Sequence, residues 1–189
     1  MKKLIVILVM AMAPVLTFGQ SLFDKYEDNE EVTSVVLTKK VFKMLADIKL
    51  DLGDADDQEI YDAIGEITGL KVLTTGDVKV ASQIKADVAK HLKSANLEEL
   101  MRIKDGDQTV KFYVKEGKDD NHVKELLMYV SGLKEAMKDN DITINGERRE
   151  METVILSLTG DIDLRQVSKL ANKMDLPGGD QLEKVNDKN

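Results

Sequence analysis

The chain has 189 residues, of which 42% are hydrophobic and 33% are charged, and its formal net charge at pH 7 is −8. The acidic excess disfavours nucleic acids and anionic membrane surfaces as partners, because both are bound mainly by cationic side chains. The sequence contains no cysteine, which excludes disulfides and thiol catalysis, so packing must stabilise the fold. The length fits one domain that buries roughly 70% of its unfolded surface.

Residues 1–19 have the layout of a secretory signal peptide. Two lysines precede an apolar run from Leu4 to Leu16, and we expect cleavage between Gly19 and Gln20. The run is shorter than the roughly 20 apolar residues of a membrane-spanning helix, so we expect no membrane insertion after cleavage. The sequence therefore predicts an exported protein of the periplasm, with release to the outside as the alternative.

The remaining chain is expected to form a single α+β domain, residues 20–176, followed by a flexible C-terminal tail, residues 177–189. The tail begins with Pro177 and two glycines and continues with polar residues, a composition typical of frayed termini. No cysteine follows the apolar run, which excludes the bacterial lipoprotein route, in which that cysteine receives the lipid.

Apolar residues recur with two periods along this domain. Spacing by four residues, as at Val80, Ile84 and Val88, predicts amphipathic helices. Alternation, as at Val110 and Phe112, predicts strands. In chain order the pattern predicts a strand, two helices, a strand, a helix, four strands and a final helix, at residues 32–37, 41–48, 60–67, 70–74, 80–92, 97–103, 110–115, 126–130, 152–159 and 164–174.

Turn and capping residues support some of these boundaries. Asp105-Gly106 predicts a hairpin turn, because glycine accepts the positive φ that the turn requires. Asp56, with Glu59 three residues later, predicts the start of the second helix. Asp161 or Asp163 is placed to cap the last helix.

Two short segments resemble each other, Thr75-Gly76-Asp77-Val78 and Thr159-Gly160-Asp161-Ile162. We interpret both as turns from a strand to a helix, in which glycine relaxes the backbone and aspartate begins the helix. Gene duplication is the alternative interpretation. Consecutive strands joined by turns also favour antiparallel pairing, so the predicted fold is a two-layer α+β fold with a largely antiparallel sheet and helices packed on one face.

Three segments resemble the exported domain-of-unknown-function 4252 family of Gram-negative envelope proteins, namely Val32 to Leu37, Val123 to Val130 and Val154 to Leu164. The most specific of these is the step from strand and glycine through Asp161-Ile162-Asp163-Leu164 into the last helix, which is a packing and capping signature. The resemblance covers most of the mature chain and implies a compartment and a fold, without a chemistry. Many proteins of this type resemble lipoproteins, and this chain departs from them by lacking the acceptor cysteine.

We predict no catalytic residue, no cofactor and no metal site. The acidic cluster at residues 51–59 departs from a calcium loop, because Glu59 stands where glycine is required when Asp54 is the first ligand. We interpret the cluster as a capped helix start, with an irregular calcium site as the alternative. His91 and His122 are the only histidines and are interpreted as surface residues.

The two faces of the predicted strands differ, and this difference gives the functional prediction. We expect Val110, Phe112, Val114, Leu126, Met128, Val130, Val154, Leu156 and Leu158 to point at the helices. The opposite face then carries four large side chains, Tyr113, Leu127, Tyr129 and Ile155. Left exposed, such a half-apolar face is typical of a partner or dimer contact. A solvated sheet back is the alternative interpretation.

We therefore expect a non-enzymatic interaction module that binds a protein partner or itself through the outer sheet face, with envelope sensing as a role that fits. The first alternative is a binder of a small molecule or an envelope ligand, with a pocket at the edge between sheet and helix near Thr75–Asp77 or Thr159–Asp161. The second is an enzyme that uses paired carboxylates, because the chain has 35 acidic residues.

Overall fold

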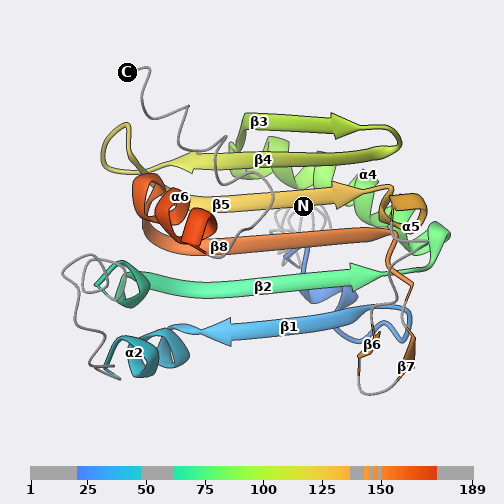
Figure 1. Ribbon diagram of the computed structural model, residues 1–189, viewed down its shortest axis with the longest axis horizontal. Helices are drawn as coiled ribbons and strands as arrows, with labels where there is room; N and C mark the ends of the chain where they lie inside the picture. Colours follow the sequence, from blue (N-terminus) through green and yellow to red (C-terminus); the bar gives the residue numbers. More distant parts are fainter. Residues whose placement is uncertain (1–20, 48–61, 137–142, 145–146, 149, 174–189) are drawn as a thin grey trace, which may run out of the picture.

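The computed structural model describes residues 21–47, 62–136, 143–144, 147–148 and 150–173. Its centre is a six-stranded antiparallel sheet in the order β1-β2-β8-β5-β4-β3 (Figure 1). The six strands are β1 (Thr33–Thr38), β2 (Ile67–Thr75), β3 (Glu98–Asp105), β4 (Gln108–Glu116), β5 (His122–Ser131) and β8 (Thr153–Asp163). Two short strands, β6 (Thr143–Ile144) and β7 (Glu147–Arg148), form a separate ribbon. The predicted α+β class and the antiparallel sheet are confirmed.

The helices lie on both sides of this sheet. They are the short 3-10 helix η1 (Asp24–Tyr26) and the α-helices α2 (Lys39–Asp47), α4 (Val78–Ala95), α5 (Leu133–Ala136) and α6 (Leu164–Lys173). Figure 1 shows α4 behind the sheet and α6 in front of it. The structure differs from the prediction that the helices pack on one face, because α4 and α6 lie on opposite faces. No helix in the described ranges is long and apolar enough to cross a membrane.

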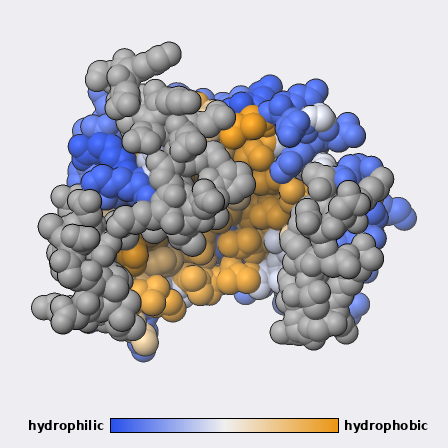
Figure 2. All heavy atoms as spheres, viewed as in Figure 1, coloured by the Kyte–Doolittle hydropathy of each residue, from blue (hydrophilic) through white to orange (hydrophobic). Residues whose placement is uncertain are grey.

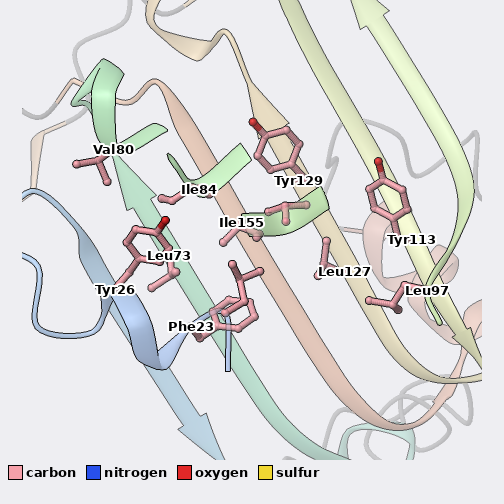
Figure 3. Close-up of a cluster of buried hydrophobic side chains, with 12 residues drawn as sticks. Phe23, Tyr26, Leu73, Val80, Ile84, Leu97, Tyr113, Leu127, Tyr129 and Ile155 are labelled. Atoms are coloured by element: carbon pink, nitrogen blue, oxygen red, sulfur yellow. The ribbon is translucent and has the colours of Figure 1, made fainter. Parts of the chain in front are cut away.

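The main core lies between α4 and the rear face of the sheet. The period of four in α4 buries Val80, Ile84 and Val88 on one side of the helix, as predicted. They meet Leu73 and other side chains of the rear face in one buried cluster (Figure 3). Burying an aliphatic side chain of this kind stabilises the fold by about 1.5–3 kcal/mol.

Short polar interactions fix the ends of α4 and of the hairpin that follows. Asp77 precedes α4, and its Oδ1 accepts a hydrogen bond of 2.8 Å from the backbone N–H of Val80, so the predicted cap is confirmed. The helix ends at Ala95, and the next residue, Asn96, caps it in the left-handed conformation at φ 55°. The predicted turn after β3 is also confirmed, with Gly106 at φ 54°.

The second copy of the Thr-Gly-Asp segment is different, and its interpretation as a turn is wrong. Thr159, Gly160 and Asp161 lie inside β8, which continues to Asp163 because it still pairs with the start of β5. Gly160 has a φ of 150° and lies close to the backbone at the start of β2, since an added Cβ would stand 2.5 Å from the carbonyl oxygen of Glu66 and 2.8 Å from Cα of Ile67. The glycine therefore permits a close backbone approach within the sheet.

The helix predicted at residues 60–67 is shorter at its C-terminal end. Residues 62–65 are helical, and β2 begins at Ile67. The predicted N-cap Asp56 and the acidic cluster at 51–59 lie outside the described residues. At the start of α6, Asp163 is the capping residue of the predicted pair, because its Oδ1 accepts a hydrogen bond of 2.9 Å from the backbone N–H of Arg165.

Candidate functional site

The front face of the sheet, opposite α4, is lined by apolar residues on all six strands. Registered neighbours form rows across it, for example Val72 beside Leu156, Leu156 beside Met128, and Met128 beside Phe112. We call this set the apolar face, and it consists of Val35, Leu37, Leu70, Val72, Met101, Ile103, Val110, Phe112, Val114, Leu126, Met128, Val130, Val154, Leu156 and Leu158. On the same side of the sheet, charged residues stand at the two ends of β3, with Glu98 opposite Val114 and Asp105 opposite Gln108.

Helix α6 covers one part of the apolar face. Leu164, at the first position of α6, is buried together with Phe112 and Leu126, and Val167 packs against the same cluster. The part on β1, β2 and the middle of β8 lies outside this cluster, and we call it the open part: Val35, Leu37, Leu70, Val72, Val154 and Leu156. Its members are half-buried or exposed. Figure 2 shows apolar residues at the surface of this side of the molecule.

The four predicted partner-binding residues are not on this surface. Tyr113, Leu127, Tyr129 and Ile155 lie on the rear face, where they are 0–8% exposed and belong to the core beneath α4 (Figure 3). The prediction that these side chains are exposed is wrong. Their neighbours Phe112 and Leu126 on the opposite face do point at a helix, as predicted, but that helix is α6 and not α4. Alternation separates the two faces of a strand, but both faces here are apolar enough to attract a helix.

Polar contacts at one end of the core join η1 to α4. The phenol of Tyr26 donates a hydrogen bond of 2.6 Å to Asp87, which also forms an ion pair with Lys25. Burial and the adjacent carboxylate raise the pKa of Tyr26. Burial also works to raise the pKa of Asp87, but the hydrogen bonds from Lys25 and Tyr26 outweigh it and hold that pKa below its ordinary value. Asp87 is therefore a structural anion.

Both histidines lie beside carboxylates. We predicted that they are surface residues, but each is half-buried. His91 Nε2 lies 3.8 Å from Oε1 of Glu125, which also accepts a hydrogen bond of 2.8 Å from Ser157. The nearby His91 and the bond from Ser157 lower the pKa of Glu125 against the effect of burial. His122 Nδ1 lies 2.7 Å from Asp119, in the loop before β5.

A pocket lies at one of the two predicted positions, beside Thr75–Asp77. Its volume is about 340 Å³, and its walls are Glu30, Glu31, Thr33, Thr74, Thr75, Gly76, Asp77, Glu150 and Met151. The hydroxyl of Thr75 donates a hydrogen bond of 2.7 Å to the backbone carbonyl of Glu31, which holds the wall before β1 against the end of β2. The carboxylates disfavour an anionic ligand, although the pocket adjoins the N-terminus of α4. The second predicted position lies within β8.

The described carboxylates with a shifted pKa share one direction. Each of them has a pKa below its ordinary value: Asp24, Asp87, Glu99, Asp119, Glu125 and Asp163. Asp163, for example, is held ionised mainly by its bonds to Arg165. In the described ranges, no group of three or more His, Asp or Glu side chains is arranged to hold a metal ion.

Comparison with known proteins identifies one family. The model of the family described as "Domain of unknown function (DUF4252)" matches residues 26–170, which span the sheet from β1 to β8 and most of α6. This match confirms the resemblance drawn from the strand segments and from the Asp-Ile-Asp-Leu step. The Gram-negative envelope context of that resemblance stays a prediction. No curated protein and no solved structure matches the chain.

Proposed function

The chain belongs to the domain-of-unknown-function family DUF4252, and from this starting point we propose that it is an exported, non-enzymatic interaction module. It binds a basic amphipathic helix of a partner protein on the open part of its apolar face. The observation that carries the proposal is the extent of this face, in which one registered row of apolar residues crosses all six strands, namely Val35, Val72, Leu156, Met128, Phe112 and Met101. Large uncharged patches on a protein surface usually mark contact sites.

Helix α6 indicates why the partner is a helix. This amphipathic helix packs on the same face through Leu164 and Val167, which are three residues apart. The open part lies beside it in the sheet, on β1, β2 and β8, and presents the same kind of aliphatic surface. A second helix with apolar residues at i, i+3, i+4 and i+7 would pack there in the same way.

The net charge of the chain indicates which charge the polar side of the partner helix carries. The formal net charge is −8, so a partner helix with lysine or arginine on its solvent side would associate faster and orient more strongly than an acidic one. The apolar face supplies the contact area, and the negative net charge of the chain supplies the preference for a cationic partner.

The pKa directions support a role outside catalysis. A carboxylic acid that donates a proton near neutral pH needs a raised pKa. The shifted carboxylates in the described ranges have lowered pKa values and stay ionised in hydrogen bonds or ion pairs, as Asp87 and Asp163 do. Export to the periplasm is proposed from the signal-like residues 1–19, and it would place the module in the envelope, where sensing is a role that fits.

Peptide binding tests the proposal directly. Residues 20–189 contain the whole described fold and are titrated against a labelled peptide with leucines at helical i, i+3, i+4 and i+7 positions and lysines elsewhere. A scrambled peptide of the same composition is the first control. We expect the helical peptide to change fluorescence anisotropy on binding and the scrambled peptide to bind at least about tenfold more weakly, because only one of them presents an apolar stripe.

Two variants locate the binding site. Leu156→Lys places a charge within the open part, beside Val72, and should abolish binding, whereas Val78→Lys, at a position 60% exposed at the start of α4, should leave it unchanged. Leu156→Thr gives a milder version if the lysine variant unfolds, and thermal unfolding monitors both. Equal peptide affinity in the Leu156 and Val78 variants, or no preference for the helical peptide, contradicts the proposal.

The pocket beside Thr75–Asp77 supports a second candidate function, that of a small-molecule binder. The supporting observation is a cavity of about 340 Å³ at a predicted position. A ligand that binds only the folded state raises the melting temperature. A thermal-shift screen of cationic and neutral small molecules, repeated on Thr75→Val, tests this candidate independently of the apolar face.

A further inference from the structure

The two edges of the sheet are built in opposite ways. The edge strand β3 carries charged side chains along its length: Glu98, Glu99, Arg102, Lys104 and Asp105. The other edge strand, β1, has the sequence Thr-Ser-Val-Val-Leu-Thr and no charge. Its Val35 and Val36 are 44% and 43% exposed. Proteins usually protect an edge strand with charge, because its outer backbone groups otherwise recruit another strand.

The outer side of β1 is available for pairing within the described part of the chain. There, β1 pairs with β2 alone, over the six registered residues from Thr33 to Thr38. In an antiparallel pair, alternate residues direct their N–H and C=O groups away from the neighbouring strand. The outward groups of β1 therefore form a row that a second antiparallel strand would satisfy.

We propose that β1 pairs antiparallel with β1 of a second copy of this chain, across a two-fold axis normal to the sheet. This joins two six-stranded sheets edge to edge and keeps both apolar faces on the same side. The contact is self-complementary, as a two-fold interface requires. Because the strand is uncharged, the pairing sets no like charges against each other, although each copy has a net charge of −8.

Charges flanking the strand favour a second copy as the occupant. Glu30 and Glu31 precede β1, Lys39 and Lys40 follow it, and all four are exposed. Antiparallel pairing brings the acidic end of one strand to the basic end of the other at both ends of the interface. A register centred on Val35 brings the turn that holds Glu30 and Glu31 in one copy towards the first residues of α2, Lys39 and Lys40, in the other copy. Opposite charges that approach each other across an interface favour that orientation, and like charges disfavour it.

Cysteine cross-linking tests this register, because the chain contains no other cysteine. In the Val35→Cys variant the two thiols lie across from each other at the two-fold axis, where the Cα spacing of about 4.5–5.5 Å suits a disulfide. Val78→Cys is the matched control, since Val78 is 60% exposed and belongs to α4, not to β1. Under mild oxidation of residues 20–189, we expect covalent dimer from Val35→Cys to form at least about tenfold faster than from Val78→Cys, because only the first thiol has a fixed neighbour.

Charge reversal tests the orientation without touching the strand itself. One variant carries Lys39→Glu and Lys40→Glu, and the other carries Glu30→Lys and Glu31→Lys. Each alone should lower the dimer fraction measured by sedimentation velocity over a concentration series, because like charges then meet at both ends. Mixing the two should restore the dimer, since every flanking contact in the mixed dimer is again between opposite charges. A purely structural role of these residues does not produce this rescue.

Four results would overturn edge pairing. The first three are a monomer at every concentration, equal cross-linking rates for the Val35 and Val78 variants, and mixing without rescue. The fourth result is a dimer that is dissociated by Leu156→Lys but remains intact in Val36→Glu. Such a dimer would form through the apolar face and not through β1. Peptide binding to that face is measured separately, so failure of the edge and failure of the proposed function are distinguishable.

Discussion

Two leucines on opposite faces of the sheet should respond very differently to truncation. Leu127 on β5 is 0% exposed beneath α4, and Leu156 on β8 is half-buried on the open part of the apolar face. Leu127→Ala removes about three buried carbon groups worth roughly 0.8 kcal/mol each, and a closed cavity adds to the loss. We expect a total of about 3–4 kcal/mol. Leu156→Ala leaves no closed cavity, so about 1 kcal/mol is expected.

Urea denaturation of residues 20–189, followed by far-ultraviolet circular dichroism, measures both losses. With a slope of about 2 kcal/mol per molar urea, Leu127→Ala should lower the midpoint by about 1.5–2 M and Leu156→Ala by about 0.5 M. Unchanged slopes would show that the variants unfold by the same transition. Equal shifts, or the larger shift for Leu156, would refute the placement of α4 over Leu127.

Other predictions concern caps, glycines and pH. Asp77→Ala should lower the free energy of unfolding by about 1 kcal/mol in the same urea assay, because Val80 N–H loses its acceptor, whereas Asp77→Asn should retain most of it. Gly160→Ala should destabilise strongly, since its Cβ would stand 2.5 Å from the carbonyl oxygen of Glu66, and a shift no larger than that of exposed Gly106→Ala would contradict this close approach. The pKa of Asp163 in the folded state is below the ordinary value of 3.8, so its contribution is complete above that pH and is lost as the pH falls through the folded pKa. Asp163→Asn should therefore show less loss of stability between neutral pH and pH about 3 than the parent chain, as melting temperatures across that range would reveal.

Local signals in the sequence predicted local structure well. Asp77 caps α4, Asp163 caps α6 and Gly106 forms the turn of the β3–β4 hairpin. Each of these features depends on a few neighbouring residues, and the side chains of those residues favour one low-energy backbone conformation. The order of the main strands and helices could also be predicted locally, because the spacing of apolar residues is two in the strands and about four in the helices.

Which face of the sheet receives the long helix could not be read from the period. Tyr113 and Leu127 alternate with Phe112 and Leu126, and both sets are large and apolar, so pattern alone ranks the faces equally. The decision comes from the long-range fit of α4 and of Tyr26, which anchors η1 to Asp87. Likewise, β8 extends past Gly160 because a distant strand continues to pair with it. Which face of the sheet is covered by α4 is therefore decided by tertiary contacts and not by the local sequence pattern.

The place of β8 has a consequence for how the molecule is made. This strand is the last of the six along the chain, yet it sits third in the sheet, between β2 and β5. Until it has been synthesised, β1–β2 and β3–β4–β5 are two separate ribbons with no shared ladder. Assembly therefore waits for nearly the whole polypeptide to emerge, and pairings distant in sequence form slowly. Such late closure keeps the first five strands of the nascent chain from joining into one sheet until the last strand has been made.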